Sequence, residues 1–224
     1  MIDSNDKTNS PAESGRGRSR SDGDQTRQRI LQAAGDLFGK QGFSATTNKS
    51  VAESAGVDLA SINYHFGSRN GLYQAVLVEA HRSIVSLDFL QQLQQSPASP
   101  EQKLAGLVRF LARVVTARQS WNVRVLVREI LVPSIDLRAL VDAEITPKIV
   151  IVRQLLAAIA GLDVNDPRLA TAMIQLAGPC LMLLVVDERL PLPVGEVRQQ
   201  PPEQVAEQML CFLIAGLKGL ASTA

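Results

Sequence analysis

The chain has 224 residues, of which 46% are hydrophobic and 20% are charged, and its formal net charge is +1. That length allows one large domain or two small ones, and the net charge is too small to indicate a nucleic-acid binder by itself. The apolar run at residues 176–186 is shorter than the roughly 20 residues of a membrane helix, and the N-terminus has no apolar signal-peptide segment. We therefore expect a cytoplasmic protein with no membrane partner.

The cysteines and histidines are few. Cys180 and Cys211 lie in apolar helical segments, where we expect reduced, buried thiols rather than a disulfide. His65 is expected to be half-buried, and His81 to be exposed to solvent. With two histidines and no Cys-x-x-Cys motif, we predict no metal site and no cofactor.

Residues 1–24 are rich in Ser, Gly, Asp and Asn and have almost no large apolar side chain, so we predict a disordered N-terminal arm. Arg16, Arg18 and Arg20 alternate with small residues there, a pattern that would suit an arm lying in a DNA minor groove. A solvated tail is the simpler interpretation.

From about Thr26, apolar residues recur at helical spacing and predict a first helix that ends near Gly42. The next segment, residues 46–69, has the pattern of a helix-turn-helix. Thr47 can cap its first helix, Gly56 can end that helix with a positive φ, and Asp58 can cap the second helix.

The spacing of Ala52, Gly56 and Ile62 suits two helices that cross at close range, because the small residues permit the approach and Ile62 plugs the angle. With Ile62 buried, the helical period places Leu59 and Phe66 on the same buried side. The opposite face is small and polar, which suits a helix in a DNA major groove. A helical hairpin with a solvated polar face remains the alternative at this point.

The segment from residue 26 to residue 73 resembles the N-terminal domain of the TetR family of transcriptional regulators. Asp58, Ala60 and Asn63 depart from the commonest family pattern, so no operator sequence can be transferred from a relative. Residues 63–68 also resemble a CecR-like subgroup. The matching motifs are residues 38–43, 46–47, 51–57 and 64–69.

The resemblance implies a three-helix DNA-binding domain at residues 25–75, joined by a helix to a ligand-binding and dimerisation domain at residues 76–224. It also implies a homodimeric repressor that a small, mostly apolar effector releases from double-stranded operator DNA. Residues 25–75 contain five Lys or Arg and three acids, a weak basic excess. The residues predicted to contact DNA are Thr46, Thr47, Lys49, Ala60, Ser61, Asn63, Tyr64, His65 and Arg69.

Downstream, Ser68 should cap a helix that runs to about Gln94 and links the two domains, followed by a break at residues 96–100. Every later segment has helical periodicity and none has a strand pattern, so the predicted fold class is all-α. Pro147, Pro167 and Pro202 stand where helices should begin.

Two very apolar helices near the C-terminus suggest an interface between subunits, as the family pairs them in a four-helix bundle. A two-fold dimer would place each helix-turn-helix on one half of a palindrome. The residues predicted at this interface are Met173, Ala177, Leu181, Cys211, Phe212, Ala215 and Gly219.

An effector pocket is expected near Gly178-Pro179, because the proline should kink its helix and open space between packed helices. Adaptable apolar side chains lie next to Gly178-Pro179, and the segment at residues 121–129 adds an aromatic side chain and two arginines. The residues predicted to line the pocket are Trp121, Arg124, Arg128, Met173 and Cys180.

Two other classes of protein fit parts of the pattern. An all-helical enzyme could use Glu129, Asp136 or Glu144, although these lie among arginines and are more simply explained by ion pairs at the surface or at helix ends. A helical ligand-binding or interaction protein that has lost DNA binding is the second alternative.

Overall fold

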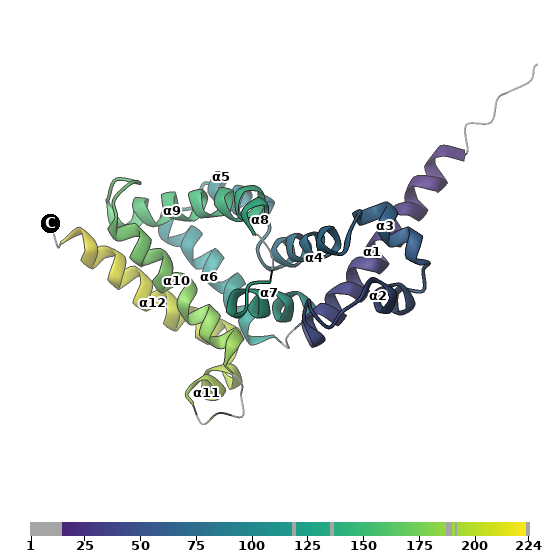
Figure 1. Ribbon diagram of the computed structural model, residues 1–224. Coiled ribbons are helices and arrows are strands. Elements are labelled where there is room, and N and C mark those ends of the chain that lie inside the picture. The colour runs from purple at the N-terminus through teal and green to yellow at the C-terminus, as the bar shows by residue number, and fades with distance from the viewer. Residues whose placement is uncertain (1–14, 118–119, 135–136, 187–189, 191, 223–224) are drawn as a thin grey trace, which may run out of the picture.

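A computed structural model describes residues 15–117, 120–134, 137–186, 190 and 192–222, without the side chains of 15–21, 139 and 221. Twelve α-helices and one π-helix account for the regular structure of these residues, and no strand occurs among them. The all-α prediction is confirmed. The helices form two parts, with the N-terminal helices at one end and the C-terminal bundle at the other (Figure 1).

The N-terminal part contains α1 (Gly15–Gln41), α2 (Asn48–Ala55), α3 (Leu59–Phe66) and α4 (Arg69–Ile84). Each contributes an apolar stripe to one shared core, as helical periodicity predicts. This core includes Ile30, Ala34, Phe38, Val51, Ala52, Ile62, Leu72, Tyr73, Val76 and Leu77.

Helix α1 begins at Gly15, well before Thr26. Residues 15–24 are therefore helical, contrary to the prediction of a disordered arm as far as residue 24; residues 1–14 lie outside the described residues. Extending an existing helix adds one hydrogen bond per residue without a new nucleation cost, so a polar composition does not stop it.

The connecting helix is shorter than predicted. It ends at Ile84, Val85 is extended, and the Ser86 hydroxyl accepts a hydrogen bond from the amide of Phe89 to cap α5 (Leu87–Gln95). The break at residues 96–100 separates α5 from α6 (Pro100–Thr116), and both of these helices pack in the C-terminal core. The break therefore lies within the C-terminal part and not between domains.

The C-terminal core is formed by α5, α6, α9 (Thr146–Ala160), α10 (Arg168–Val185) and α12 (Pro202–Ala221). Shorter elements connect them: α8 (Arg138–Leu140), the π-helix η1 (Val141–Ile145) and α11 (Val194–Gln199). The core includes Leu90, Leu104, Val108, Leu156, Leu169, Leu176, Val205 and Leu217.

Helix α10 is long and apolar enough over its 18 residues to match the composition of a membrane span. The sequence analysis counted only residues 176–186 as apolar, so it underestimated the length of this apolar segment. Six of its residues are buried against the other helices of the bundle, and others, including Ile174 and Met182, are exposed on an outer face. A core helix with a second apolar face accounts for this composition.

Helix α7 (Trp121–Leu131) lies between the two parts. Val125 belongs to the core of the N-terminal helices, whereas Val123 packs with α6 and α10. A Cβ atom built on Gly35 of α1 would lie 2.1 Å from the Trp121 ring, so only glycine permits this approach of the two helices.

A buried carboxylate fastens α7 to α4. Glu129 is 3% exposed and accepts hydrogen bonds from the Tyr73 hydroxyl at 2.7 Å, the Ser134 amide at 2.8 Å and the Ser134 hydroxyl at 2.6 Å. Burial and the adjacent carboxylate raise the pKa of Tyr73. Glu129 was expected to form an ion pair at the surface or at a helix end, and the structure differs in that tertiary packing encloses this carboxylate; Asp136 lies outside the described residues.

Candidate DNA-binding surface and effector cavity

Local hydrogen bonds form the helix-turn-helix as predicted. Thr47 caps α2, and its side chain accepts from the amide of Ser50; Asp58 caps α3 by accepting from the amide of Ser61 at 2.7 Å. That hydrogen bond lowers the pKa of Asp58. Gly56 adopts φ 63° at the end of α2, in the left-handed region that favours glycine. These three short-range features set where α3 starts relative to α2.

The outer face of α3 is exposed. Ile62 is fully buried, while Ala60, Asn63 and Tyr64 face solvent, with Tyr64 86% exposed. Ser61 and His65 are half-buried beside them. All five were predicted DNA contacts, and they lie on the surface or at its edge.

Two apolar residues of α3 behave differently from each other. Leu59 is 48% exposed, so the prediction that it is buried is wrong. It stands at the first turn of a two-turn helix, beyond the edge of the core. Phe66, at the other end, is partly buried, with the Arg27 guanidinium 5.4 Å from its ring centroid.

The residues predicted to hold the DNA backbone divide into two groups. Thr47 and Lys49 are exposed at the start of α2. Thr46 is fully buried, and its hydroxyl donates to the Gly42 carbonyl at 2.9 Å, so its side chain cannot reach DNA as predicted.

Arg69 is also turned inward. Its guanidinium lies 4.2 Å from the Phe43 ring centroid and donates to the Phe43 carbonyl. This contact fastens the turn before α2 to the start of α4, which differs from the predicted phosphate contact. Arg69 therefore has the geometry of a positioning residue.

Gly71 is a residue that the motif analysis missed. A Cβ atom there would lie 2.2 Å from the backbone carbonyl oxygen of Phe66, and Ser68 caps the same turn by accepting from the Gly71 amide. The junction of α3 and α4 therefore requires glycine. The only sequence signal was a glycine in the first turn of an otherwise good helix.

Gly71→Ala should destabilise the protein by about 1–3 kcal/mol, because the clash is with backbone and no side-chain rotation relieves it. Denaturant unfolding followed by circular dichroism measures this. Gly23→Ala in α1 is the control, since a Cβ there meets nothing within 4 Å and should be neutral or stabilising. Equal stability of Gly71→Ala and the wild type would contradict the proposed crowding.

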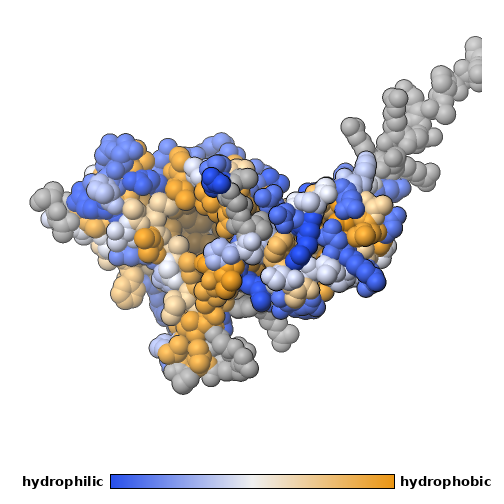
Figure 2. Space-filling view, in the orientation of Figure 1, coloured by the Kyte–Doolittle hydropathy of each residue, from blue (hydrophilic) through white to orange (hydrophobic). Residues whose placement is uncertain are grey.

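The C-terminal part contains an open apolar cavity of about 330 Å³ lined by the end of α4 and by α5, α6, α7, η1, α9 and α10. We call it the effector cavity. Figure 2 shows an apolar recess at this part of the molecular surface. The lining includes Ile84, Leu107, Leu111, Val123, Leu126, Ile130, Ile149, Met173, Leu176, Cys180 and Leu181.

Two of the five residues predicted to line an effector pocket meet this cavity. Met173 and Cys180 do line the effector cavity, and burial raises the pKa of the Cys180 thiol to about 11. Trp121 instead packs on α1 and donates to Gln32 at 2.8 Å, and Arg124 pairs with Asp36 of α1 at 3.3 Å. Arg128 lies on the outer surface next to Gly42.

One cluster of charged and polar side chains meets this cavity. Lys148 is 6% exposed, and its Nζ lies 2.9 Å from Nδ1 of His81 on α4 and 3.8 Å from the Glu144 carboxylate. Glu144, in the π-helix, also accepts from Nε of Arg82 at 2.7 Å. The prediction of a solvated His81 is wrong, because the fold brings α4 against η1 and α9. Glu144 forms an ion pair with an arginine, Arg82, but at a buried position.

The electrostatics of this cluster follow from burial. Burial and the neighbouring Lys148 lower the pKa of His81 to about 4, so His81 is neutral at pH 7. Burial also lowers the pKa of Lys148, opposed by Glu144. Within the described residues, no group of three or more His, Cys, Asp or Glu is placed to hold a metal ion.

The outer face of α10 and α12 is apolar and exposed. On α12, Cys211, Phe212, Ala215 and Gly219 are exposed as an interface requires, with Phe212 83% exposed. Cys211 is therefore not buried as predicted, although both cysteines are free.

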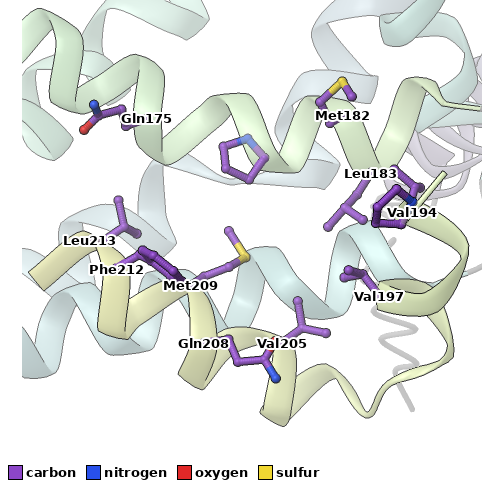
Figure 3. A pocket seen from close by; sticks show the side chains of 12 residues that line it. Gln175, Met182, Leu183, Val194, Val197, Val205, Gln208, Met209, Phe212 and Leu213 are labelled. Carbon is purple, nitrogen blue, oxygen red and sulfur yellow. The ribbon is translucent and has the colours of Figure 1, made fainter. Parts of the chain in front are cut away.

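The α10 residues predicted at the interface do not lie on the same face as the most exposed apolar residues of that helix. Met173, Ala177 and Leu181 line the effector cavity, whereas Ile174 and Met182, 71% and 54% exposed, face outward. A groove of about 610 Å³ lies between α10, α11 and α12 (Figure 3). Met182, Leu183, Val197, Met209 and Phe212 are among its lining residues.

Comparison with known proteins agrees with this architecture. Residues 30–76 match the model of bacterial regulatory proteins of the tetR family, and residues 100–220 match that of the C-terminal domain of the HTH-type transcriptional dual regulator CecR. The chain belongs to the TetR family, with a CecR-type C-terminal domain. This is a family of transcriptional regulators and not of enzymes, which removes the enzyme alternative.

Among its relatives, CecR of Shigella flexneri is 26% identical over 212 residues, which cover 89% of this chain and 94% of that protein. The repressor KstR2 of Mycolicibacterium smegmatis is 35% identical over 85 residues, covering 36% of this chain and 38% of that protein. The long match to CecR includes both parts of the TetR-family architecture.

Two solved structures share the fold. AibR, in complex with isovaleryl coenzyme A and operator DNA, aligns with a TM-score of 0.63 and 19% identity, covering 84% of this chain and 98% of AibR. FadR from Bacillus subtilis, in complex with stearoyl-CoA, aligns with a TM-score of 0.62 and 14% identity, covering 84% of this chain and 98% of FadR. At these identities the likeness concerns the fold alone.

Proposed function

We propose that this TetR-family chain is a sequence-specific, DNA-binding transcriptional repressor that acts as a homodimer and is released from its operator by a small, mostly apolar ligand. The exposed face of α3 is the observation that carries the proposal. Ala60, Asn63 and Tyr64 point to solvent from a helix that Ile62 anchors in the core. Such a regulator acts in the cytoplasm, where its operator lies.

The side chains of α3 suit a major groove. Ala60 is small enough for close approach, Asn63 can form a bidentate pair with adenine, and the Tyr64 hydroxyl can reach a phosphate or a base. Lys49 and the first-turn amides of α2 are placed to hold the DNA backbone nearby. Arg69 acts by holding the turn that presents α2.

The α10–α12 face is the proposed dimer interface. Exposed apolar side chains on both helices, chiefly Ile174, Met182 and Phe212, continue into the groove of Figure 3. Contiguous apolar patches on soluble proteins mark interaction sites. A second copy would cover the face and pair two α3 helices for a palindromic operator.

The effector cavity supports the response to a ligand. It is apolar, and it touches His81 and Ile84 at the C-terminal end of α4, whose N-terminal end packs against α3. The CoA thioesters named with AibR and FadR carry apolar acyl groups, which fits such a lining. A ligand that binds better to the conformation off the operator would release DNA.

Asn63→Ala should weaken binding to the operator by about 1–3 kcal/mol and relax specificity at one base pair. Fluorescence anisotropy with the chain's own upstream DNA, and with single-base variants of it, measures both effects. Gln91→Ala, on the exposed surface of α5, is the matched control and should bind like the wild type.

The same experiment decides between the two remaining alternatives. If the wild type binds its upstream DNA no better than unrelated DNA of equal length, the chain is a helical ligand-binding protein without operator recognition. If Asn63→Ala binds every variant as the wild type does, α3 has been assigned the wrong role.

A further inference from the structure

We infer that the effector cavity is built for an amphipathic carboxylic acid, whose carboxylate binds Lys148 and whose hydrocarbon body fills the apolar lining. This inference rests on the proposed function and names the chemical class of its effector. The site lies between several helices, with Lys148 of α9 and His81 of α4 on its wall.

The lining is polar at only one place. Among its residues, His81 and Lys148 are the two with nitrogen-bearing side chains, and all others within the described part of the chain are aliphatic or sulfur-containing. A ligand with one polar end and an apolar body therefore matches this lining. A second charged group would lie against hydrocarbon, at a cost of several kcal/mol.

The ammonium group of Lys148 has hydrogen-bonding capacity to spare. It carries three donors, and its close partner is Nδ1 of His81 at 2.9 Å; the His81 carbonyl lies at 3.5 Å and the Glu144 carboxylate at 3.8 Å. The two longer contacts are weak or beyond hydrogen-bond range. A ligand carboxylate at this point would supply the short, charge-assisted bond that the buried ammonium lacks.

The anion nearest to Lys148 is shared with a second cation. Glu144 accepts a hydrogen bond from Nε of Arg82 at 2.7 Å, whereas its distance to Nζ of Lys148 is 3.8 Å. Buried charges are stabilised by close pairing, and a ligand anion would give Lys148 a partner within hydrogen-bond distance. A neutral or cationic ligand of the same shape would not.

The size of the cavity limits the body of the ligand. If each non-hydrogen atom occupies about the 30 Å³ that a water molecule takes in the liquid, 330 Å³ holds roughly eleven atoms. An eight-carbon acid has that size. Ile130, Ile149 and Leu181, at 55%, 40% and 37% exposure, provide an apolar edge through which it can enter.

Binding at Lys148 would also act on α4. A ligand carboxylate bound to the spare donors of Lys148 would place a second short contact on the ammonium group that touches Nδ1 of His81, so filling the site would change the link between α9 and the C-terminal end of α4. Tyr73, on the same helix, belongs to the core that supports α3. His81 is thus a positioning residue that couples the cavity to the DNA-binding helices.

The test compares octanoate with 1-octanol, octylamine and octanoyl-CoA on the full chain, by calorimetry and by operator release. Octanoate should bind at least ~10-fold more tightly than 1-octanol, as one charge-assisted hydrogen bond provides, and octylamine should bind more weakly still. Equal binding of octanoate and 1-octanol, or tighter binding of octanoyl-CoA, which has no free carboxylate at the acyl group, would overturn the inference.

Variants locate the site. Lys148→Met should remove the preference for octanoate over 1-octanol while retaining 1-octanol binding, and Lys148→Arg should keep the preference. Arg109→Met, which removes a positive charge from the exposed surface of α6, is the control and should bind like the wild type. If Lys148→Met does not fold, the comparison of the four compounds on the wild type still tests whether the cavity prefers a carboxylate.

The coupling between the effector cavity and operator release is measured separately. His81→Leu should bind octanoate in the calorimeter yet need more of it to release the operator, whereas unchanged release would exclude the role of His81. A chain that never binds operator DNA refutes the proposed function, while calorimetry still reports on the carboxylate site. A chain that binds operator but not octanoate refutes only this inference.

Discussion

Ala215→Glu should convert the dimer to a monomer and lower affinity for a palindromic operator by about 10²–10⁴-fold. Ala215 lies on the exposed stripe of α12 with Phe212 and Gly219, where small residues permit close helix approach. A glutamate there would bring two like charges together across a two-fold axis and bury them without partners. Two half-sites would then be bound independently, and the gain from linking them would be lost.

Sedimentation and anisotropy on the same samples measure both effects. Phe212→Glu, at the most exposed apolar position of the face, should act in the same way. Gln91→Glu places the same charge on exposed α5 and should leave both the dimer and its affinity unchanged. A wild type that is monomeric at micromolar concentration and still binds a palindrome tightly would exclude the interface.

Glu129→Ala should destabilise the protein by roughly 3 kcal/mol or more. It removes the acceptor for the Tyr73 hydroxyl and for the amide and hydroxyl of Ser134, and each buried donor without a partner costs about 1–3 kcal/mol. Some of this is recovered where Ser134 reaches water, since Ser134 is exposed. The measurement is denaturant unfolding, with Glu196→Ala on exposed α11 as the control.

A double-mutant cycle isolates the contact between α4 and α7. Tyr73→Phe removes only the hydroxyl, so its cost should be smaller than that of Glu129→Ala, and the two changes together should cost less than their sum. Additive effects would show that the 2.7 Å contact contributes nothing measurable. Weaker transmission from the effector cavity to operator release should accompany the loss of this link.

The N-terminal domain was predicted in most of its detail because its signals are local. Thr47, Asp58 and Ser68 each cap a helix by bonding to the amide three residues ahead, and Gly56 supplies the positive φ next to them. A bond that spans three residues depends little on the rest of the fold. The spacing from Ala52 and Gly56 also identified Ile62 as a buried residue of α3, although Leu59, placed by helical periodicity from Ile62, shows that periodicity fails where a short helix projects beyond the core.

The placement of the effector site was predicted less well. Met173 and Cys180 were found because the apolar face of α10 and its proline indicated a helix beside open space. Trp121 and Arg124 were misplaced because the sequence shows that α7 is amphipathic but not which of its neighbours each face meets. The same uncertainty explains why Met173, Ala177 and Leu181 of α10 were predicted at the interface although they line the effector cavity.

By itself, the sequence determined the helical class, the capped helix-turn-helix and the two apolar C-terminal helices, since these depend on propensity, capping and spacing within a few residues. Only the tertiary structure decided that Arg69 is held against Phe43, that Glu129 meets Tyr73, and that Lys148 meets His81 from 67 residues away. Contacts between residues so far apart in the sequence depend on how helices pack and cross. The side-chain pattern along one helix does not specify which other helix it packs against. The proposed DNA-binding surface is therefore visible in the sequence, while the polar cluster of the proposed effector cavity exists only in the folded chain.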